Sequence, residues 1–226
     1  MSAAEAASLI KDGMTVGMSG FTRAGEAKAV PAALAEMAAQ KPLKISLMTG
    51  ASLGNDLDKK LTEAGVLARR MPFQVDATLR KAINNGEVMF IDQHLSETVE
   101  QLRNKQLKKP DIAVIEAVAI TEDGHIVPST SVGNSASFAL LADQVIVEIN
   151  LAHGKDIEGL HDIYIPTHRP ERTPIPVLKA DSRIGLGAIP VDPAKIVAVV
   201  INEQDDSTSN VLPPDVIFEQ LDLPAK

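Results

Sequence analysis

Residues 15–31 read TVGMSGFTRAGEAKAVP, an apolar strand that runs through a glycine-rich loop directly into a helix. Gly17, Gly20 and Gly25 remove side chains where the backbone turns tightly or approaches a ligand. Backbone amides around such a loop, and at the start of the helix, can face an anion or a developing oxyanion. A plain turn between a strand and a helix explains the same residues equally well. The stretch therefore predicts a strand–loop–helix unit and leaves its chemistry open.

Helical and extended patterns alternate along the rest of the chain. Residues 111–120, DIAVIEAVAI, form an almost uninterrupted apolar run, which is typical of a central strand buried on both faces. This alternation predicts an α/β fold with an open, largely parallel sheet and flanking helices. Further strands are expected at 44–48, near residue 67, and at 88–91, 125–127, 144–149 and 196–201; helices are expected at 27–39, 76–83, 97–105 and 138–142. Ser2 and Glu5 form a capping-box pattern that predicts one more helix at the N-terminus.

Ligands in such sheets bind beyond the carboxyl ends of the strands. The loops at 20–25, 49–54 and 131–137 follow strands and form the expected ligand face. In the third loop, Asn134 or Ser135 either caps the next helix or helps to hold a carboxylate, carbonyl or phosphate. Residues 151–187 are irregular and rich in proline, as in a functional loop or an excursion over a partner domain.

Two carboxylates, Glu116 and Glu148, lie within apolar strands. A carboxylate in that position needs a partner or a raised pKa. Each is either a general base or ligand-orienting group, or a structural carboxylate that accepts hydrogen bonds from loop amides. The structural role is the more frequent of the two in proteins.

Composition excludes several classes of protein. The chain has 226 residues, a net charge of −8 and no cysteine, so it has no disulfide, no cysteine-based zinc site and no thiol catalysis. The acidic balance argues against non-specific nucleic-acid binding. The histidines lack the spacing of metal ligands, so we expect no metal site. No apolar run is long enough to span a bilayer and no secretory signal is visible, which favours a cytoplasmic protein that does not bind membranes.

Several segments carry a family resemblance: SGFTRAGEAKAVP (19–31), LMTGAS (47–52), DIAVIEAVAITEDGHIVPSTSVGNSASF (111–138), ADQVIVEIN (142–150), EGLHDIY (158–164) and PAKIVAVV (193–200). Together they resemble the acetyl-CoA hydrolase/transferase family of class I CoA-transferases. Succinyl-CoA:acetate, propionyl-CoA:succinate and 4-hydroxybutyrate CoA-transferases are the relatives in question. The likeness covers nearly the whole chain in the right order.

The resemblance implies an enzyme that moves CoA between carboxylic acids, with acetyl-CoA, succinyl-CoA or a similar thioester as substrate and no covalently bound cofactor. In the family a glutamate attacks the thioester, giving an acyl-glutamyl anhydride and then a glutamyl-CoA thioester. Amide donors stabilise the oxyanions, and hydrolysis follows where water intercepts an intermediate. That glutamate belongs to a second, carboxy-terminal domain in the family. The resemblance thus implies an amino-terminal domain at 1–204, and at 205–226 a linker and short helix toward a second domain that acts in cis or in trans. The chain alone is then expected to be inactive, with no catalytic residue of its own.

The positions that match the family's two loops near the acyl group are the expected substrate-binding residues: Gly20, Phe21, Thr22, Gly25, Gly133, Asn134 and Ser135. Met71 stands where the resemblance leads us to expect a small polar residue, which leaves the form of the acyl pocket open. Neither Glu116 nor Glu148 matches the nucleophile. The basic pairs Arg69 with Arg70 and Arg169 with Arg172 either contact CoA phosphates, lie on a solvated face or form an interdomain salt bridge.

Two other functions remain open. One is a non-catalytic module that binds acyl-CoA or a carboxylate, or acts as a regulatory partner. The other is an isomerase of a phosphorylated sugar, which would need an acid/base pair at the strand ends. An isolated half of a two-domain enzyme would expose apolar surface, so we expect a homo- or hetero-oligomer.

Overall fold

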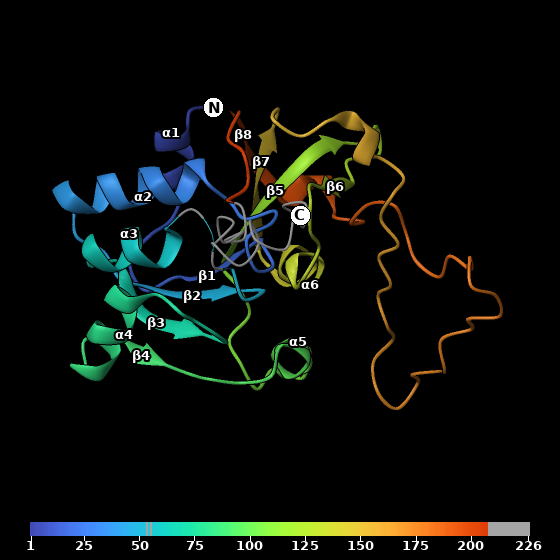
Figure 1. The fold of residues 1–226 in the computed structure, drawn as a ribbon, viewed down its shortest axis with the longest axis horizontal. Helices are drawn as coiled ribbons and strands as arrows, with labels where there is room; N and C mark the ends of the chain where they lie inside the picture. The colour runs from blue at the N-terminus through green and yellow to red at the C-terminus, as the bar shows by residue number, and fades with distance from the viewer. Residues whose placement is uncertain (53, 55, 208–226) are drawn as a thin grey trace, which may run out of the picture.

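A mostly parallel β-sheet forms the centre of the molecule, as a computed structural model that describes residues 1–52, 54 and 56–207 shows (Figure 1). Its strands are β1 (Thr15–Met18), β2 (Ile45–Thr49), β3 (Leu67–Met71), β4 (Met89–Phe90), β5 (Ile112–Ile120), β6 (Ile126–Pro128), β7 (Gln144–Asn150) and β8 (Ile196–Asn202). The order is β4-β3-β2-β1-β5-β7-β8, and every neighbouring pair in it is parallel. The predicted α/β fold with a largely parallel sheet is confirmed.

The chain enters the sheet at β1 and adds β2, β3 and β4 on one side, then crosses to the other side of β1 with β5, β7 and β8. A topological switch point therefore lies between β1 and β5, which is where open α/β sheets bind ligands. β5 extends beyond the end of β1, because Met18 at that end pairs with Val114. β6 then returns antiparallel along the extension of β5, pairing Pro128 with Ala117. The chain after β6 consequently arrives beside the carboxyl end of β1.

Helices cover both faces of the sheet: α1 (Ala3–Ala7), α2 (Ala29–Gln40), α3 (Leu57–Glu63), α4 (Ala77–Asn84), α5 (Leu95–Arg103) and α6 (Ser135–Leu141), with 3-10 turns η1 (Lys155–Ile157) and η2 (Pro193–Lys195). Alternate residues of β5 separate two cores. Ile112 and Val114 pack in the cluster with α1–α4, whereas Ala113 and Ile115 pack in the cluster with α5 and α6. Because side chains alternate along a strand, Glu116 belongs to the face covered by α1–α4.

The ends of the elements differ little from those expected. The capping box of α1 is present, with Ser2 Oγ accepting from the Glu5 amide at 3.2 Å. α6 begins at Ser135, three residues before the expected start at 138. None of the helices in the described ranges is long and apolar enough to cross a membrane.

Residues 151–187 are irregular apart from η1, as expected, and their middle part runs away from the sheet (Figure 1). A bridge between Ile163 and Leu186 closes the base of this excursion. Asp162 accepts from the amides of Ile184 and Gly185, the latter at 2.6 Å. Of the predicted linker and short helix at 205–226, residues 205–207 are described, and 208–226 lie outside the described residues.

Candidate substrate site at the carboxyl edge of the sheet

Three loops meet at the carboxyl ends of the central strands. A Cβ added to Gly50, after β2, would lie 2.6 Å from the carbonyl oxygen of Gly20 and 3.1 Å from the backbone nitrogen of Asn134. A Cβ on Gly133 would lie 3.4 Å from the Gly20 carbonyl oxygen and 3.4 Å from Cβ of Phe21. The backbones of the three loops therefore touch. The structure brings Gly20 and Phe21 together with Gly133 and Asn134, although the two pairs lie more than 100 residues apart in the sequence.

The loop at 20–25 adopts a tight and unusual conformation. Phe21 and Ala24 exchange backbone hydrogen bonds at 3.0 and 3.1 Å, and the Thr22 amide donates to the carbonyl of Ala51 at 3.1 Å. Thr22 and Ala51 both have left-handed backbones, with φ of 54° and 65°. Non-glycine residues in that region carry strain, which in proteins concentrates at functional sites and ligand clamps.

Two buried polar side chains at this junction have no hydrogen-bond partner within the part of the chain that the structure describes. They are the amide nitrogen Nδ2 of Asn134 and the hydroxyl of Ser135. The two residues are 9% and 1% exposed. Asn134 occupies the N-cap position of α6, but its side chain makes no capping bond. A buried donor without a partner costs about 1–3 kcal/mol, and an oxygen atom of a ligand would recover that cost.

An open hollow of about 560 Å³ lies beside the junction. Its lining residues come from the loops after β1, β2, β3 and β4: Phe21, Thr22, Ala51, Phe73, Asp92, Gln93, His94 and Leu95. Phe21 and Phe73 are 42% and 41% exposed, so aromatic surface faces the hollow instead of the core. Of the seven predicted substrate-binding residues, Phe21 and Thr22 line this hollow, whereas Gly20, Gly25, Gly133, Asn134 and Ser135 do not. Gly25 lies elsewhere. It packs against Ser129 and Ser131, on the side of a buried polar cluster.

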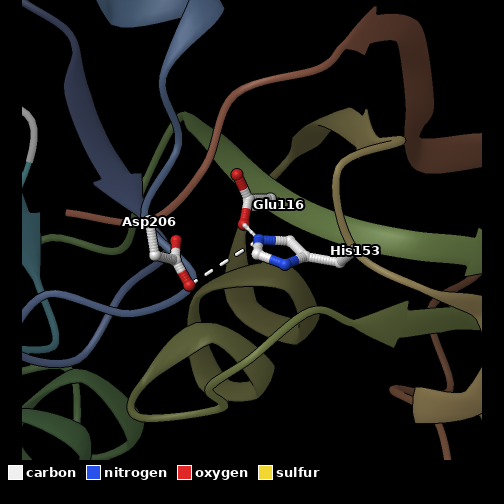
Figure 2. Close-up of side chains that lie close together, drawn as sticks. All are labelled: Glu116, His153 and Asp206. Atoms are coloured by element: carbon white, nitrogen blue, oxygen red, sulfur yellow. Dashed lines mark ion pairs between the residues drawn. The ribbon is translucent and has the colours of Figure 1, made fainter. Parts of the chain in front are cut away.

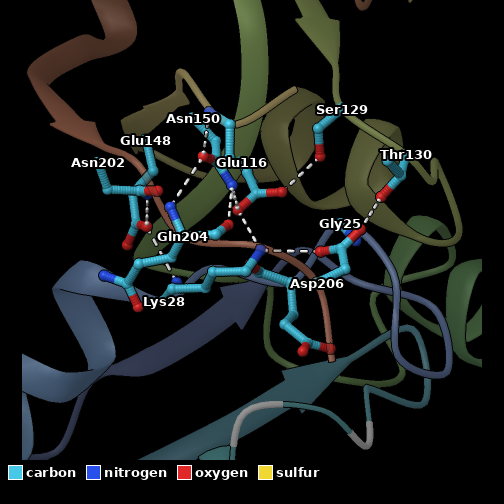
Figure 3. Close-up of polar contacts among 12 residues, drawn as sticks. Gly25, Lys28, Glu116, Ser129, Thr130, Glu148, Asn150, Asn202, Gln204 and Asp206 are labelled. Atoms are coloured by element: carbon cyan, nitrogen blue, oxygen red, sulfur yellow. Dashed lines mark hydrogen bonds and ion pairs between the residues drawn. The ribbon is translucent and has the colours of Figure 1, made fainter. Parts of the chain in front are cut away.

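That cluster is centred on Lys28 and Glu116, which form an ion pair of 2.5 Å with side chains 1% and 0% exposed (Figure 3). The other oxygen of Glu116 accepts from the Ser129 hydroxyl at 2.6 Å. Asn150 Nδ2 donates to Glu116 Oε2 at 3.1 Å, and Lys28 also pairs with Asp206 at 2.9 Å. We call the group Lys28, Glu116, Ser129, Asn150 and Asp206 the Lys28 cluster. Glu116 is thus held by side chains, not by the loop amides that its structural role predicted.

Electrostatic interactions within the cluster keep Lys28 and Asp206 charged. Burial alone would lower the pKa of Lys28, but the charges and hydrogen bonds of Glu116 and Asp206 outweigh burial and raise it. Burial likewise would raise the pKa of Asp206, yet hydrogen bonds from Thr130 and Lys28 and the charge of Lys28 lower it. The ammonium and the Asp206 carboxylate are therefore both ionised at neutral pH.

Glu148 has the structural role that its position predicted. Its carboxylate accepts from the backbone amides of Lys28, Ala29 and Val30 at 2.9, 3.0 and 2.7 Å, at the N-terminus of α2. Asn202 Nδ2 donates to the same carboxylate at 2.9 Å. Burial raises the pKa of Glu148, against the backbone amides that lower it. A carboxylate at a helix start satisfies amides that have no partner within the helix.

One set of side chains has the composition of a metal site. Glu116, His153 and Asp206 each offer one ligand atom, and these atoms lie within 4.8 Å of one another (Figure 2). His153 Nε2 lies 3.7 Å from Glu116 Oε1 and 3.6 Å from Asp206 Oδ2. The ammonium of Lys28 already contacts both carboxylates. It supplies the positive charge that a metal ion would otherwise bring, so the arrangement does not need one.

Arg70, Arg172 and Met71 contact other parts of the fold. Arg70 is fully buried and pairs with Asp58 at 2.7 Å, and Arg172 pairs with Glu100 at 2.6 Å. Arg70 and Arg172 therefore each form a salt bridge with another described residue of the same domain. Met71 is 1% exposed and lies in the core cluster of α5 and α6, away from the hollow.

Sequence reasoning missed three members of this region: Lys28, His153 and Asp206. Lys28 alone left a signal, because it is a lysine directly before a helix whose first seven residues, AVPAALA, are all apolar. His153 and Asp206 lie in irregular segments where charged residues are common, and nothing in their local sequence marks them.

Comparisons of the sequence with known proteins identify one family. Residues 1–201 match the family described as the acetyl-CoA hydrolase/transferase N-terminal domain. The chain is 44% identical to a succinyl-CoA:acetate CoA-transferase of Clostridium kluyveri over 205 residues, which is 90% of this chain and 38% of that protein. It is 41% identical to an acetyl-CoA hydrolase of Saccharomyces cerevisiae, covering 92% of this chain and 41% of that one. The chain thus spans about two-fifths of the length of the curated relatives that it matches.

Solved structures share the fold at low sequence identity. RipA from Yersinia pestis superposes with a TM-score of 0.63 at 15% identity, over 96% of this chain and 45% of RipA. Glutaconate coenzyme A-transferase from Acidaminococcus fermentans gives a TM-score of 0.54 at 16% identity, over 66% and 65% of the two chains. The chain belongs to the acetyl-CoA hydrolase/transferase family, and residues 1–201 correspond to the amino-terminal domain of that family.

Proposed function

We propose that this chain provides the substrate-binding loops of a CoA-transferase or acyl-CoA hydrolase, in which CoA moves between small carboxylic acids or to water. The observation that carries the proposal is the junction of the three glycine loops. It leaves the Asn134 amide and the Ser135 hydroxyl buried and without partners among the described residues, beside a hollow with aromatic walls. Donors of this kind suit the oxygen of a thioester carbonyl, a carboxylate or a tetrahedral oxyanion.

The chemistry itself requires a nucleophile that these residues do not supply. Glu116 is ion-paired with Lys28, and Glu148 is occupied by the amides of α2. Neither is free to attack a thioester. The family resemblance assigns that step to a glutamate of a carboxy-terminal domain, and the relatives' greater length is consistent with such a domain acting in cis or in trans. Acyl-CoA and small carboxylates are then the substrates, and the proposed reaction uses no cofactor besides coenzyme A.

Transfer of CoA from acetyl-CoA or succinyl-CoA to acetate, propionate and succinate tests the proposal. The chain is assayed alone and after addition of the carboxy-terminal portion of the Clostridium kluyveri relative. Turnover only in the mixture supports the proposal. Turnover by the chain alone contradicts the assignment of the nucleophile, and Glu116 and Glu148 would then be the first residues to replace.

Asn134→Asp provides the matching test of the site. It places a negative charge where we propose that the ligand oxygen binds, so activity of the mixture should fall by at least about 100-fold, as for loss of an oxyanion donor. Asn84→Asp makes the same change at an exposed position of α4 and should leave activity unchanged. Equal activity of the two variants contradicts the site.

A second candidate function is a module that binds acyl-CoA or a carboxylate without catalysis, because Glu116 and Glu148 are both engaged by other groups of the described chain. The same experiment separates the two. If the halves associate and acetyl-CoA binds, but no CoA is transferred, the binding module replaces the enzyme as the explanation.

A further inference from the structure

The chain does not leave the sheet where β8 ends. Gln204 and Asn150 exchange hydrogen bonds, with the Gln204 amide donating to Asn150 Oδ1 at 3.2 Å and Asn150 Nδ2 donating to the Gln204 carbonyl at 2.7 Å. These bonds turn residues 203–207 back across the carboxyl ends of the strands. The turn brings the Asp206 carboxylate into the Lys28 cluster (Figure 3).

Asp206 joins its own segment to two others, the connection between β1 and α2 and the loop after β6, through one carboxylate. Oδ1 accepts from the Gly25 amide at 3.2 Å and from Lys28 Nζ at 2.9 Å, while Oδ2 accepts from the Thr130 hydroxyl. The side chain is 19% exposed, so most of it is shielded from water. Hydrogen bonds to a charged acceptor are stronger than neutral ones, and shielding strengthens them further.

The loop at 20–25 needs such contacts. Thr22 is held in a left-handed conformation, and a strained conformation persists only where its surroundings fix it. Outside the loop itself, the Thr22 amide is held by Ala51, and the Ala24 carbonyl accepts from Ser131 at 2.8 Å. The Gly25 amide is held by Asp206. Asp206 is thus the contact that ties the end of the loop to the segment beyond the last strand.

We propose that Asp206 is a positioning residue for the substrate loop. By accepting from the Gly25 amide and from Lys28, it fixes residues 20–25 in the conformation that borders the hollow of Phe21 and Thr22. Asp206 does not line that hollow, so it acts through the loop and not on the ligand. The inference deepens the proposed function and rests on it, because it takes this loop to be part of the acyl site.

Hydrogen–deuterium exchange of the full chain tests the contact without any ligand. Asp206→Ala removes the acceptor, whereas Asp205→Ala removes the same charge from the exposed neighbouring residue, for which no hydrogen bond or ion pair is seen to residues 1–52, 54 or 56–207. In Asp206→Ala, exchange in a peptide covering 19–27 should accelerate by roughly 10- to 100-fold, the effect of losing one hydrogen bond to a charged acceptor. A reference peptide covering 112–118 in β5 should exchange at the wild-type rate.

Asp206→Asn distinguishes positioning from a general loss of stability. It keeps an oxygen for the Gly25 amide, so exchange at 19–27 should lie between wild type and Asp206→Ala. The proposal is overturned if Asp206→Ala matches Asp205→Ala at 19–27. It is also overturned if the β5 reference peptide accelerates as much as the loop, because the residue would then serve only the stability of the whole fold.

Binding of acetyl-CoA, measured by calorimetry on the same proteins, connects the loop to the ligand. Affinity should fall about 10-fold or more in Asp206→Ala and stay at the wild-type value in Asp205→Ala. Faster loop exchange with unchanged affinity overturns the functional role of Asp206. If wild type itself does not bind acetyl-CoA, the failure lies with the proposed function, and exchange at 19–27 still decides whether Asp206 holds the loop.

Discussion

Replacing Lys28 with methionine should destabilise the fold more than any single change of a surface charge. The substitution Lys28→Met keeps the length of the side chain and removes its ammonium. It takes away the ammonium that contacts both the Glu116 carboxylate, which is 0% exposed, and the Asp206 carboxylate. Breaking a buried ion pair from one side costs about 3–5 kcal/mol, since the charge that remains is neither hydrated nor paired. Ser129 and Asn150 still donate to Glu116, so we expect the lower part of that range.

Urea unfolding followed by circular dichroism measures this cost. With a slope of about 3 kcal/mol per molar urea, the midpoint should fall by about 1 M. Lys59→Met is the control, because Lys59 is exposed in α3 and its loss should change the free energy of unfolding by no more than about 0.5 kcal/mol.

The double variant Lys28→Met with Glu116→Gln removes both charges of the pair. It should be more stable than the sum of the two single changes predicts, since neither buried charge is left alone. A midpoint for Lys28→Met within about 0.3 M of the Lys59→Met midpoint would refute the reasoning. So would strict additivity of the two single variants.

Three further outcomes follow from the same contacts. Glu148→Ala leaves the first amides of α2 without an acceptor and should lower the free energy of unfolding by about 3 kcal/mol in urea, while Glu148→Gln should cost less because it keeps one oxygen. Gly20→Ala would place a Cβ 2.2 Å from Ser52 Oγ and should lower the melting temperature well below that of Gly65→Ala, where a Cβ meets nothing within 4 Å; similar melting temperatures would contradict the close packing of the loops. The pKa of Asp206 is lowered on folding, so its contribution to stability is complete above about pH 3.9 and is lost as pH falls through the lower, folded pKa. Asp206→Asn should therefore flatten the decline of melting temperature below about pH 4, and an acid limb as steep as that of wild type would contradict the ion pair.

The sequence was most informative where one residue type dictates one environment. The apolar run at 111–120 predicted a central strand, and β5 is buried on both faces over most of its length. The rule that parallel strands present their carboxyl ends at one edge predicted that the loops after different strands would meet. Gly20, Gly50 and Gly133 do meet there, because the absence of side chains lets their backbones touch.

The sequence was least informative about which groups contact a buried charge. Alternation placed Glu116 on the opposite face from its neighbours in β5, but it could not identify the groups on that face. Lys28 and Asn150 lie 88 and 34 residues from Glu116 in sequence, and only the folded chain brings them within hydrogen-bond distance. The early start of α6 has a similar cause. Ser135 and Ser137 are typical of loops, yet Phe138 is 0% exposed and packs so closely on Gly17 that a Cβ there would lie 2.8 Å from its ring.

The members of the Lys28 cluster lie far apart along the chain, and this separation determines when the cluster can form during synthesis. The two carboxylates that hold Lys28 are 88 and 178 residues further along the chain. Contacts between such distant residues form late, because a long loop must close first. During synthesis the Lys28 cluster therefore cannot be complete until residue 206 has emerged, long after the residues of β1 to β4 and their helices. The contacts of this cluster therefore belong to the late steps of folding, and incomplete chains lack them.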